Sequence, residues 1–126
     1  MTSVPSDLRY TTDHQWVRHQ EDGRVCTGLT DHGQRQLGDI VNVELPEVGA
    51  TYEASAAIGK VETRGAVSAV YAPVAGEVAA VNDSLSESPE DLNDNPYGAW
   101  IVELTASEID LPGLLSAPEY EAYIRA

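Results

Sequence analysis

The chain has 126 residues, which is enough for one domain with a real core and too few for two comfortable ones. Seven Lys and Arg against 21 Asp and Glu give a formal net charge of −14, which argues against nucleic-acid and anionic-membrane partners. The single cysteine excludes an internal disulfide and a multi-cysteine metal site, and the three histidines lack the paired spacing of zinc ligands.

The first half of the chain predicts a series of short strands. Apolar and β-branched residues alternate with polar ones over four stretches, each bounded by a polar or glycine-containing turn. These stretches are residues 9–11, 15–18, 23–29 and 39–45. After the third, Thr30 and Asp31 are suited to cap a helical turn over residues 32–37, which Gly38 would end.

The second half predicts a β-hairpin followed by further strands. Residues 52–63 read as a longer strand region, and residues 67–73 return antiparallel to it. Residues 64–66 then fall at the tip of this hairpin. Two more strands are expected at residues 76–81 and 100–104, so that the protein as a whole is predicted to be mainly β.

Short helices are expected outside this β core. Ser88 as cap and Pro89 at the first helical position are typical of a helix start. Ser116 and Glu119 have capping-box spacing at the start of a C-terminal helix. The apolar stripe of that helix consists of Tyr120, Tyr123 and Ile124. We expect a single domain over residues 1–126, with a core over about 8–105 and a C-terminal helical segment over about 106–126.

No signal in the sequence points to an enzyme, a membrane protein or an exported protein. Residues 1–8 have neither an apolar signal region nor an Arg- and Ser-rich amphipathic stretch, and no apolar run approaches the roughly 18 residues of a membrane span. There is no paired nucleophile and base and no phosphate loop. His32 is the one candidate acid or base, and we expect it to be an exposed helix residue. A non-catalytic, cytoplasmic monomer without a bound metal is predicted.

Four stretches, in order along the chain, resemble the H protein of the glycine cleavage system. They are Leu8–Val17; Gly28–Asp31 with Leu37–Val41 and Leu45–Gly49; Val61–Thr63 with Tyr71–Val78; and Asn95–Gly98 with Trp100 and the Glu119-Tyr120 pair. The resemblance covers roughly residues 8–124. It implies a lipoyl-domain-like fold, a barrel-sandwich hybrid with short peripheral helices. It also implies a shuttle that carries lipoate on a lysine at a hairpin tip.

The resemblance further implies partners and a docking surface. Such a carrier would visit glycine decarboxylase, the aminomethyltransferase and dihydrolipoyl dehydrogenase. The residues that the resemblance places on the docking surface are Glu62, Thr63, Arg64, Tyr71, Pro73, Asn95, Pro96 and Tyr97.

One departure from the family pattern bears directly on function. The tip reads Val61-Glu62-Thr63-Arg64-Gly65-Ala66, so that Gly65 occupies the position of the lipoyl lysine. Glycine has no amine to acylate, and the guanidinium of Arg64 stays protonated and is a poor acyl acceptor. No lipoate is therefore expected. A tight tip often requires a positive φ, which glycine adopts freely, so we expect Gly65 to suit the backbone there.

Two other residues are alternative attachment sites. Lys60 is the only lysine in the chain; alternation places it with Glu62 on the outer face, about 16 Å back from the tip at about 3.3 Å per residue. Cys26 occupies what looks like an outward position and is expected to be accessible, although an inert strand cysteine is the simpler interpretation. Three functions thus stay open: a binding or regulatory homologue without the carrier arm, a carrier that uses Lys60 or Cys26, and a repurposed module that serves another pathway's enzyme.

Overall fold

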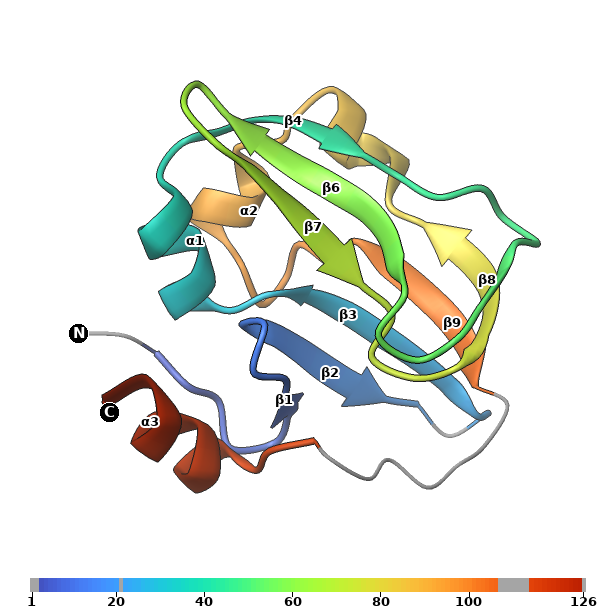
Figure 1. Cartoon of the computed structure of the whole chain (residues 1–126), viewed down its shortest axis with the longest axis horizontal. Coiled ribbons are helices and arrows are strands. Elements are labelled where there is room, and N and C mark those ends of the chain that lie inside the picture. Colours follow the sequence, from blue (N-terminus) through green and yellow to red (C-terminus); the bar gives the residue numbers. More distant parts are fainter. Residues whose placement is uncertain (1–2, 21, 107–113, 126) are drawn as a thin grey trace.

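The computed structural model describes residues 3–20, 22–106 and 114–125, which form two antiparallel sheets with short helices around them (Figure 1). The larger sheet has the strand order β1 (Arg9–Tyr10), β2 (Gln15–His19), β3 (Arg24–Leu29), β9 (Val102–Ala106), β8 (Gly76–Val81) and β5 (Thr51–Tyr52). The smaller sheet has the order β4 (Ile40–Glu44), β6 (Ala57–Thr63) and β7 (Val67–Tyr71). The helical segments are α1 (Asp31–Leu37), η1 (Asp83–Ser86), α2 (Asp91–Asp94) and α3 (Ala117–Arg125). The predicted mainly β class is confirmed.

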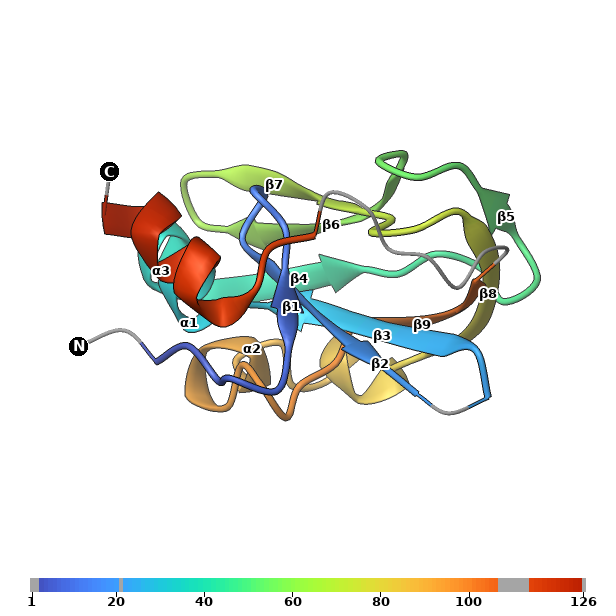
Figure 2. The ribbon, with the colours of Figure 1, turned by 90° about the horizontal axis from the view of Figure 1, so that it is seen from below.

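The main core lies between the two sheets. When the molecule is viewed from below, β6 and β7 lie on one side and β3 and β9 on the other (Figure 2). The core side chains come from both sheets and are almost entirely aliphatic, among them Val25, Val43, Val61, Val70, Val78 and Leu104. Each such side chain contributes roughly 1.5–3 kcal/mol when it is fully buried, so the core can be stable without a single Phe.

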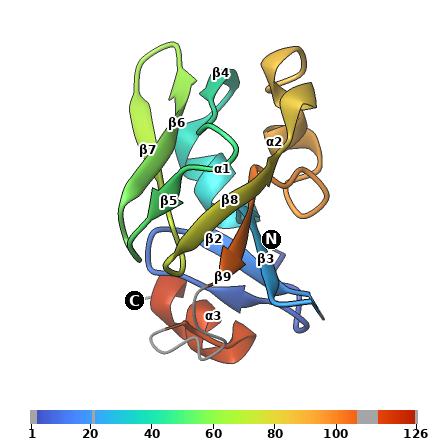
Figure 3. The same cartoon turned by 90° about the vertical axis from the view of Figure 1, so that its right-hand side faces the viewer.

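A second, smaller core packs α3 against the outer side of β1, β2 and β3. Its buried members include Tyr10, Trp16, Cys26 and Tyr120. The rings of Tyr10 and Tyr120 stack with centroids 4.7 Å apart and planes inclined by 11°. Figure 3 shows the result for the overall shape, because α3 closes one end of the molecule and the tip of the β6–β7 hairpin projects at the other.

The predicted caps of α1 and α3 are confirmed. The Thr30 hydroxyl accepts a hydrogen bond from the Gly33 N–H at 3.0 Å, and α1 ends at Gly38, whose φ is 86°. At the start of α3, the Ser116 N–H donates to the Glu119 carboxylate at 2.9 Å, and the Glu119 N–H donates to the Ser116 hydroxyl at 3.3 Å. Both helices therefore begin where the local sequence can satisfy their free N–H groups.

Several predicted boundaries are wrong. Ser88 and Pro89 do not begin a helix: their carbonyls accept turn hydrogen bonds from Asp91 and Leu92, and α2 starts only at Asp91. The region 52–63 is interrupted by a turn in which Ser55 has a φ of 70°. The last strand begins at residue 102 instead of 100, and η1 was not predicted. In each case the chain must change direction, which strand and helix propensities do not encode.

Two hydrogen bonds of the Tyr120 hydroxyl hold α3 in place. The Tyr120 hydroxyl lies 2.8 Å from His14 Nδ1 and 2.7 Å from the Thr30 hydroxyl, which is fully buried. His14 has a φ of 65°, and its ring centroid lies 4.7 Å from that of His32. Burial, with a smaller contribution from the charge of His32, lowers the pKa of His14, while Asp13 opposes the shift. The folded protein thus favours neutral His14.

We expect stability to fall as pH is lowered through about 6.5, the pKa of an unfolded histidine, because the unfolded chain then binds a proton that folded His14 resists. We therefore expect Tm to decrease over the same interval, in the direction that the lowered pKa of His14 sets. Thermal unfolding across this pH range measures the effect. His14→Asn, which tolerates the positive φ, should flatten the pH dependence; an unchanged slope would assign it to other groups.

Candidate functional site

The tip of the β6–β7 hairpin is a tight turn over residues 63–66. The last register pair before it joins Glu62 to Val67. The Thr63 N–H donates to the Ala66 carbonyl at 2.9 Å, and the Thr63 hydroxyl lies 3.4 Å from both that carbonyl and the Gly65 N–H. These contacts lie within the turn itself. Residues 64–66 are exposed, so the tip is an accessible point with an ordered backbone.

Glycine fits the backbone at the tip, but the positive φ that a tight tip often requires is not found at Gly65. Gly65 does not belong to the glycines with positive φ, which are Gly23, Gly38 and Gly49. A Cβ atom at position 65 would have no heavy atom within 4 Å. Hydrogen bonds between Thr63 and the Ala66 carbonyl close the turn, and the turn does not use the conformational freedom of glycine. Any L-residue, lysine included, therefore fits at position 65 without a shift of the chain.

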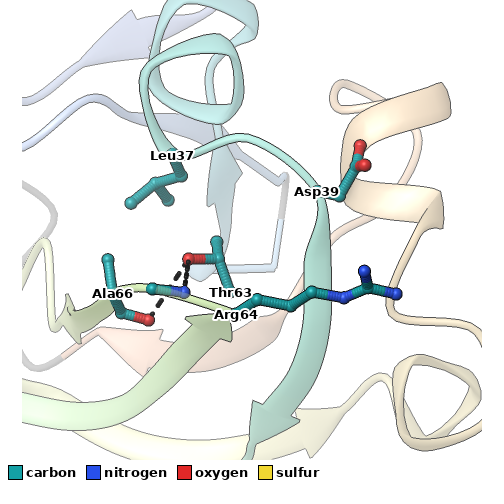
Figure 4. Close-up of a pocket in the computed structure, with 6 residues that line it drawn as sticks. Leu37, Asp39, Thr63, Arg64 and Ala66 are labelled. Carbon is teal, nitrogen blue, oxygen red and sulfur yellow. Dashed lines mark hydrogen bonds between the residues drawn. The ribbon is translucent and has the colours of Figure 1, made fainter.

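An open hollow of about 370 Å³ lies beside the tip and is lined by the end of α1, the loop into β4 and the turn residues. Its lining residues are Leu37, Asp39, Thr63, Arg64, Gly65 and Ala66 (Figure 4). Asn93 of α2 fixes the loop that carries Asp39, because its amide accepts from the Ile40 N–H and donates to the Gly38 carbonyl, both at 2.9 Å. The hollow is thus positioned by three separate segments.

Lys60 lies on the outer face of the smaller sheet, as predicted, and its amine is held by carboxylates. It pairs across the strands with Glu44, and its Nζ is 3.3 Å from the Glu44 carboxylate and 3.9 Å from that of Glu62. The Glu62 carboxylate also accepts a hydrogen bond from Asn42 at 2.9 Å. These side chains belong to β4 and β6, and the row ends at Glu62, beside the tip. The two carboxylates hold the Lys60 amine against the sheet surface.

Of the two interpretations of Cys26, the accessible thiol is wrong, and the inert strand cysteine agrees with the structure. Its residue is only 4% exposed because the α3 cluster covers this face of β3. The thiol donates toward the Glu103 carboxylate at 3.5 Å and accepts from the Gln20 amide at 3.1 Å. Burial, and then the neighbouring Glu103, raise the pKa of the Cys26 thiol to about 12. A buried, protonated thiol is a poor nucleophile, so Cys26 behaves as a packing residue.

The residues predicted to form a docking surface fall in three places. Glu62, Thr63 and Arg64 lie at or beside the tip, whereas Tyr71 pairs with Ala57 at the other end of the hairpin. Pro73 follows in the connection to β8, and the third group, Asn95, Pro96 and Tyr97, follows α2.

Several polar atoms of this third group form hydrogen bonds within the protein. The Pro96 carbonyl accepts from the Trp16 indole at 2.9 Å. The Tyr97 hydroxyl accepts from the Asp31 N–H at 3.1 Å and donates to the Ser3 carbonyl. These bonds tie the N-terminal segment and α1 to the larger sheet.

Two residues of the site were not predicted from the sequence. Leu37 and Asp39 are distant from the hairpin along the chain and reach it only because α1 and α2 pack together. The one available signal was Leu37 itself, an apolar residue directly before the glycine that ends a helix.

The described residues contain neither a metal-binding cluster nor a membrane-spanning helix. Within residues 3–20, 22–106 and 114–125, no group of three or more His, Cys, Asp or Glu side chains is arranged to hold a metal ion. None of the helices in the same ranges has the length and apolar character needed to cross a membrane.

Comparisons with known proteins agree with the fold and the sequence. Residues 8–126 match the sequence model of a family described as "Glycine cleavage H-protein". The chain is 49% identical over 125 residues to the glycine cleavage system H protein 2 of Pseudomonas putida, and 48% identical over 126 residues to the glycine cleavage system H protein of Escherichia coli O9:H4; each comparison covers 98% of both chains. A crystal structure of a glycine cleavage system H protein from Mycobacterium marinum superposes with a TM-score of 0.89 at 34% identity, covering 98% of this chain and 100% of that one.

Proposed function

This chain belongs to the glycine cleavage H-protein family, and we propose that within the family it is a non-carrier homologue, which keeps the scaffold and docking surface but has no lipoyl arm. The single observation that carries the proposal is the exposed hairpin tip, where Arg64, Gly65 and Ala66 offer no amine. An arm attached as an amide needs an amine at that point. The residues present at the tip do not fit a lipoyl group.

The residues around the tip support the loss of the lipoyl attachment site without any loss of the hairpin's structure. The turn is closed by hydrogen bonds of Thr63, and the strands on either side keep regular pairing up to Glu62 and Val67. A lysine side chain at position 65 would point into open space. The scaffold that presents an arm in carriers is thus intact here, which favours a protein that still meets the partners of a carrier.

Neither alternative attachment site supports a carrier. The Lys60 amine is engaged by Glu44 and Glu62 on the sheet face, and an arm starting there would have to lie along β6 before it reached a partner. The Cys26 thiol is buried under α3 with a pKa raised by burial to about 12. The proposal therefore assigns no covalent cargo to the chain and describes it as non-catalytic.

The proposed partners are glycine decarboxylase and the aminomethyltransferase, which a carrier of this family would visit. We also propose that the chain is one domain over residues 1–126 and acts as a cytoplasmic monomer. Its net charge of −14 would favour encounter with basic surfaces on such enzymes, more strongly at low salt.

Intact mass measurement tests the proposal. We expect protein co-expressed with a lipoate ligase to have the mass of the unmodified chain, and we expect it to be retained on immobilised glycine decarboxylase or aminomethyltransferase. Lys60→Arg is the matched control for modification, because it keeps the positive charge between Glu44 and Glu62. A lipoyl or octanoyl increment that disappears in Lys60→Arg would establish the carrier alternative, and failure to bind either enzyme would contradict the docking role.

A further inference from the structure

The hairpin tip carries a cation that forms no ion pair with any of the described residues. In the described part of the chain, Arg24, Arg35, Lys60 and Arg125 take part in ion pairs. Arg18 instead lies over the Trp16 ring, 4.7 Å from the ring centroid, and donates to the Tyr97 carbonyl. Arg9 of β1 lies near α3, where, after the hydrogen bonds of Ser116, it helps to lower the pKa of Glu119.

Arg64 differs from all of these basic residues. It is exposed, and within the described residues no carboxylate forms an ion pair with its guanidinium. Figure 4 shows its side chain extended away from Leu37 and Ala66, past β4 and toward the side of the hollow on which Asp39 lies. Glu62, its near neighbour in sequence, is already engaged by Asn42 and Lys60. In a chain of net charge −14, this is a positive group displayed at the tip of a projecting hairpin.

Two exposed apolar side chains lie on the strands next to the turn that carries Arg64. Val67, the first residue of β7, is 63% exposed, and Val41, at the irregular start of β4, is 47% exposed. The register places both next to the turn, since Glu62 pairs with Val67 and Ile40 with Thr63. Exposed apolar side chains gathered around a prominent charged group are typical of a contact surface, because water leaves both on docking.

We propose that the Arg64 guanidinium enters an acidic depression with apolar walls on the partner enzyme, so that this chain competes with lipoylated carriers for one surface. The inference rests on the proposed function and deepens it. The partner is identified by charge: a planar guanidinium pairs best with a carboxylate in a bidentate contact, and Val41 and Val67 exclude water around that pair. The chain is then an antagonist of carriers as well as a binder.

A competition assay with glycine decarboxylase tests this inference. The enzyme is driven by a lipoylated relative, such as the Escherichia coli protein, and the unmodified chain is added at increasing concentration. We expect the apparent KM for the lipoylated carrier to rise while kcat stays constant. Arg64→Glu should weaken the inhibition at least about tenfold, because it places a like charge against the acidic depression. Arg64→Lys should retain part of the effect.

Arg125→Glu is the matched control. It makes the same change in net charge on an exposed arginine of α3, at the end of the molecule opposite the tip (Figure 3). If Arg64→Glu and Arg125→Glu both inhibit as the parent chain does, the inference is overturned while the proposed docking role stands. If the parent chain binds neither glycine cleavage enzyme, the proposed function fails and the inference fails with it. Both arginines lie on the surface, and circular dichroism verifies that each variant is folded.

Discussion

Gly65→Lys is expected to turn this chain into a carrier. After co-expression with a lipoate ligase, the variant should gain a single lipoyl increment in its intact mass, and it should support glycine decarboxylation where the parent chain gives no detectable turnover. The physical reason is that position 65 is exposed, has no positive φ and has no atom within 4 Å of a new Cβ. The fold therefore leaves room for a lysine side chain, with its amine, at position 65.

Two controls make this result specific. Gly65→Ala adds a side chain at the same position without an amine, and it should stay unmodified. Lys60→Arg combined with Gly65→Lys should still be modified once, which assigns the increment to position 65. If Gly65→Lys folds and is never acylated, then the ligase must read features of the hairpin that this chain has also lost, and the departure from a carrier extends beyond one residue.

Features set by near neighbours were predictable from the sequence. Thr30, Gly38 and the Ser116–Glu119 pair act within one helical turn, and the structure shows the same hydrogen bonds that their spacing predicts. The hairpin tip also follows from local sequence, because the strands on both sides end near the predicted residues.

The wrong predictions depend on contacts distant in sequence. Cys26 alternates as an outward residue of β3, yet α3, far later in the chain, covers it. This burial, and then Glu103 of β9, raise the pKa of its thiol. The hollow beside the tip depends on Asn93, which holds the α1–β4 connection from 53 residues away. No local pattern in a single sequence reports such packing.

The position of Gly65 shows a further limit of local reasoning. A glycine at a hairpin tip is usually explained by its ability to adopt a positive φ. That explanation fails here, because Gly65 does not have a positive φ. The fold therefore does not require glycine at position 65. Under the proposed function, the consequence of glycine here is that position 65 has no amine to which an arm could be attached.

Gly59→Ala and Gly65→Ala separate structural from functional glycine within one hairpin. A Cβ at Gly59, inside β6, would overlap the backbone carbonyl of Glu44 on the neighbouring strand, and neither strand can move without disturbing the core. We expect Gly59→Ala to lower the free energy of unfolding by about 2–3 kcal/mol, as overpacking does in well-packed cores. Gly65→Ala should change it by less than about 0.5 kcal/mol.

Urea unfolding of the two variants measures this difference, and equal slopes of the transitions would show that only stability has changed. Comparable destabilisation by both variants would mean that the tip does need glycine, and the argument for a freely replaceable position 65 would fail. If only Gly59→Ala lowers the free energy of unfolding strongly, then the hairpin needs glycine where its strands pair and does not need it at the tip. The tip is then free to gain or lose an amine at almost no cost in stability, so that carriers and non-carriers can share one scaffold.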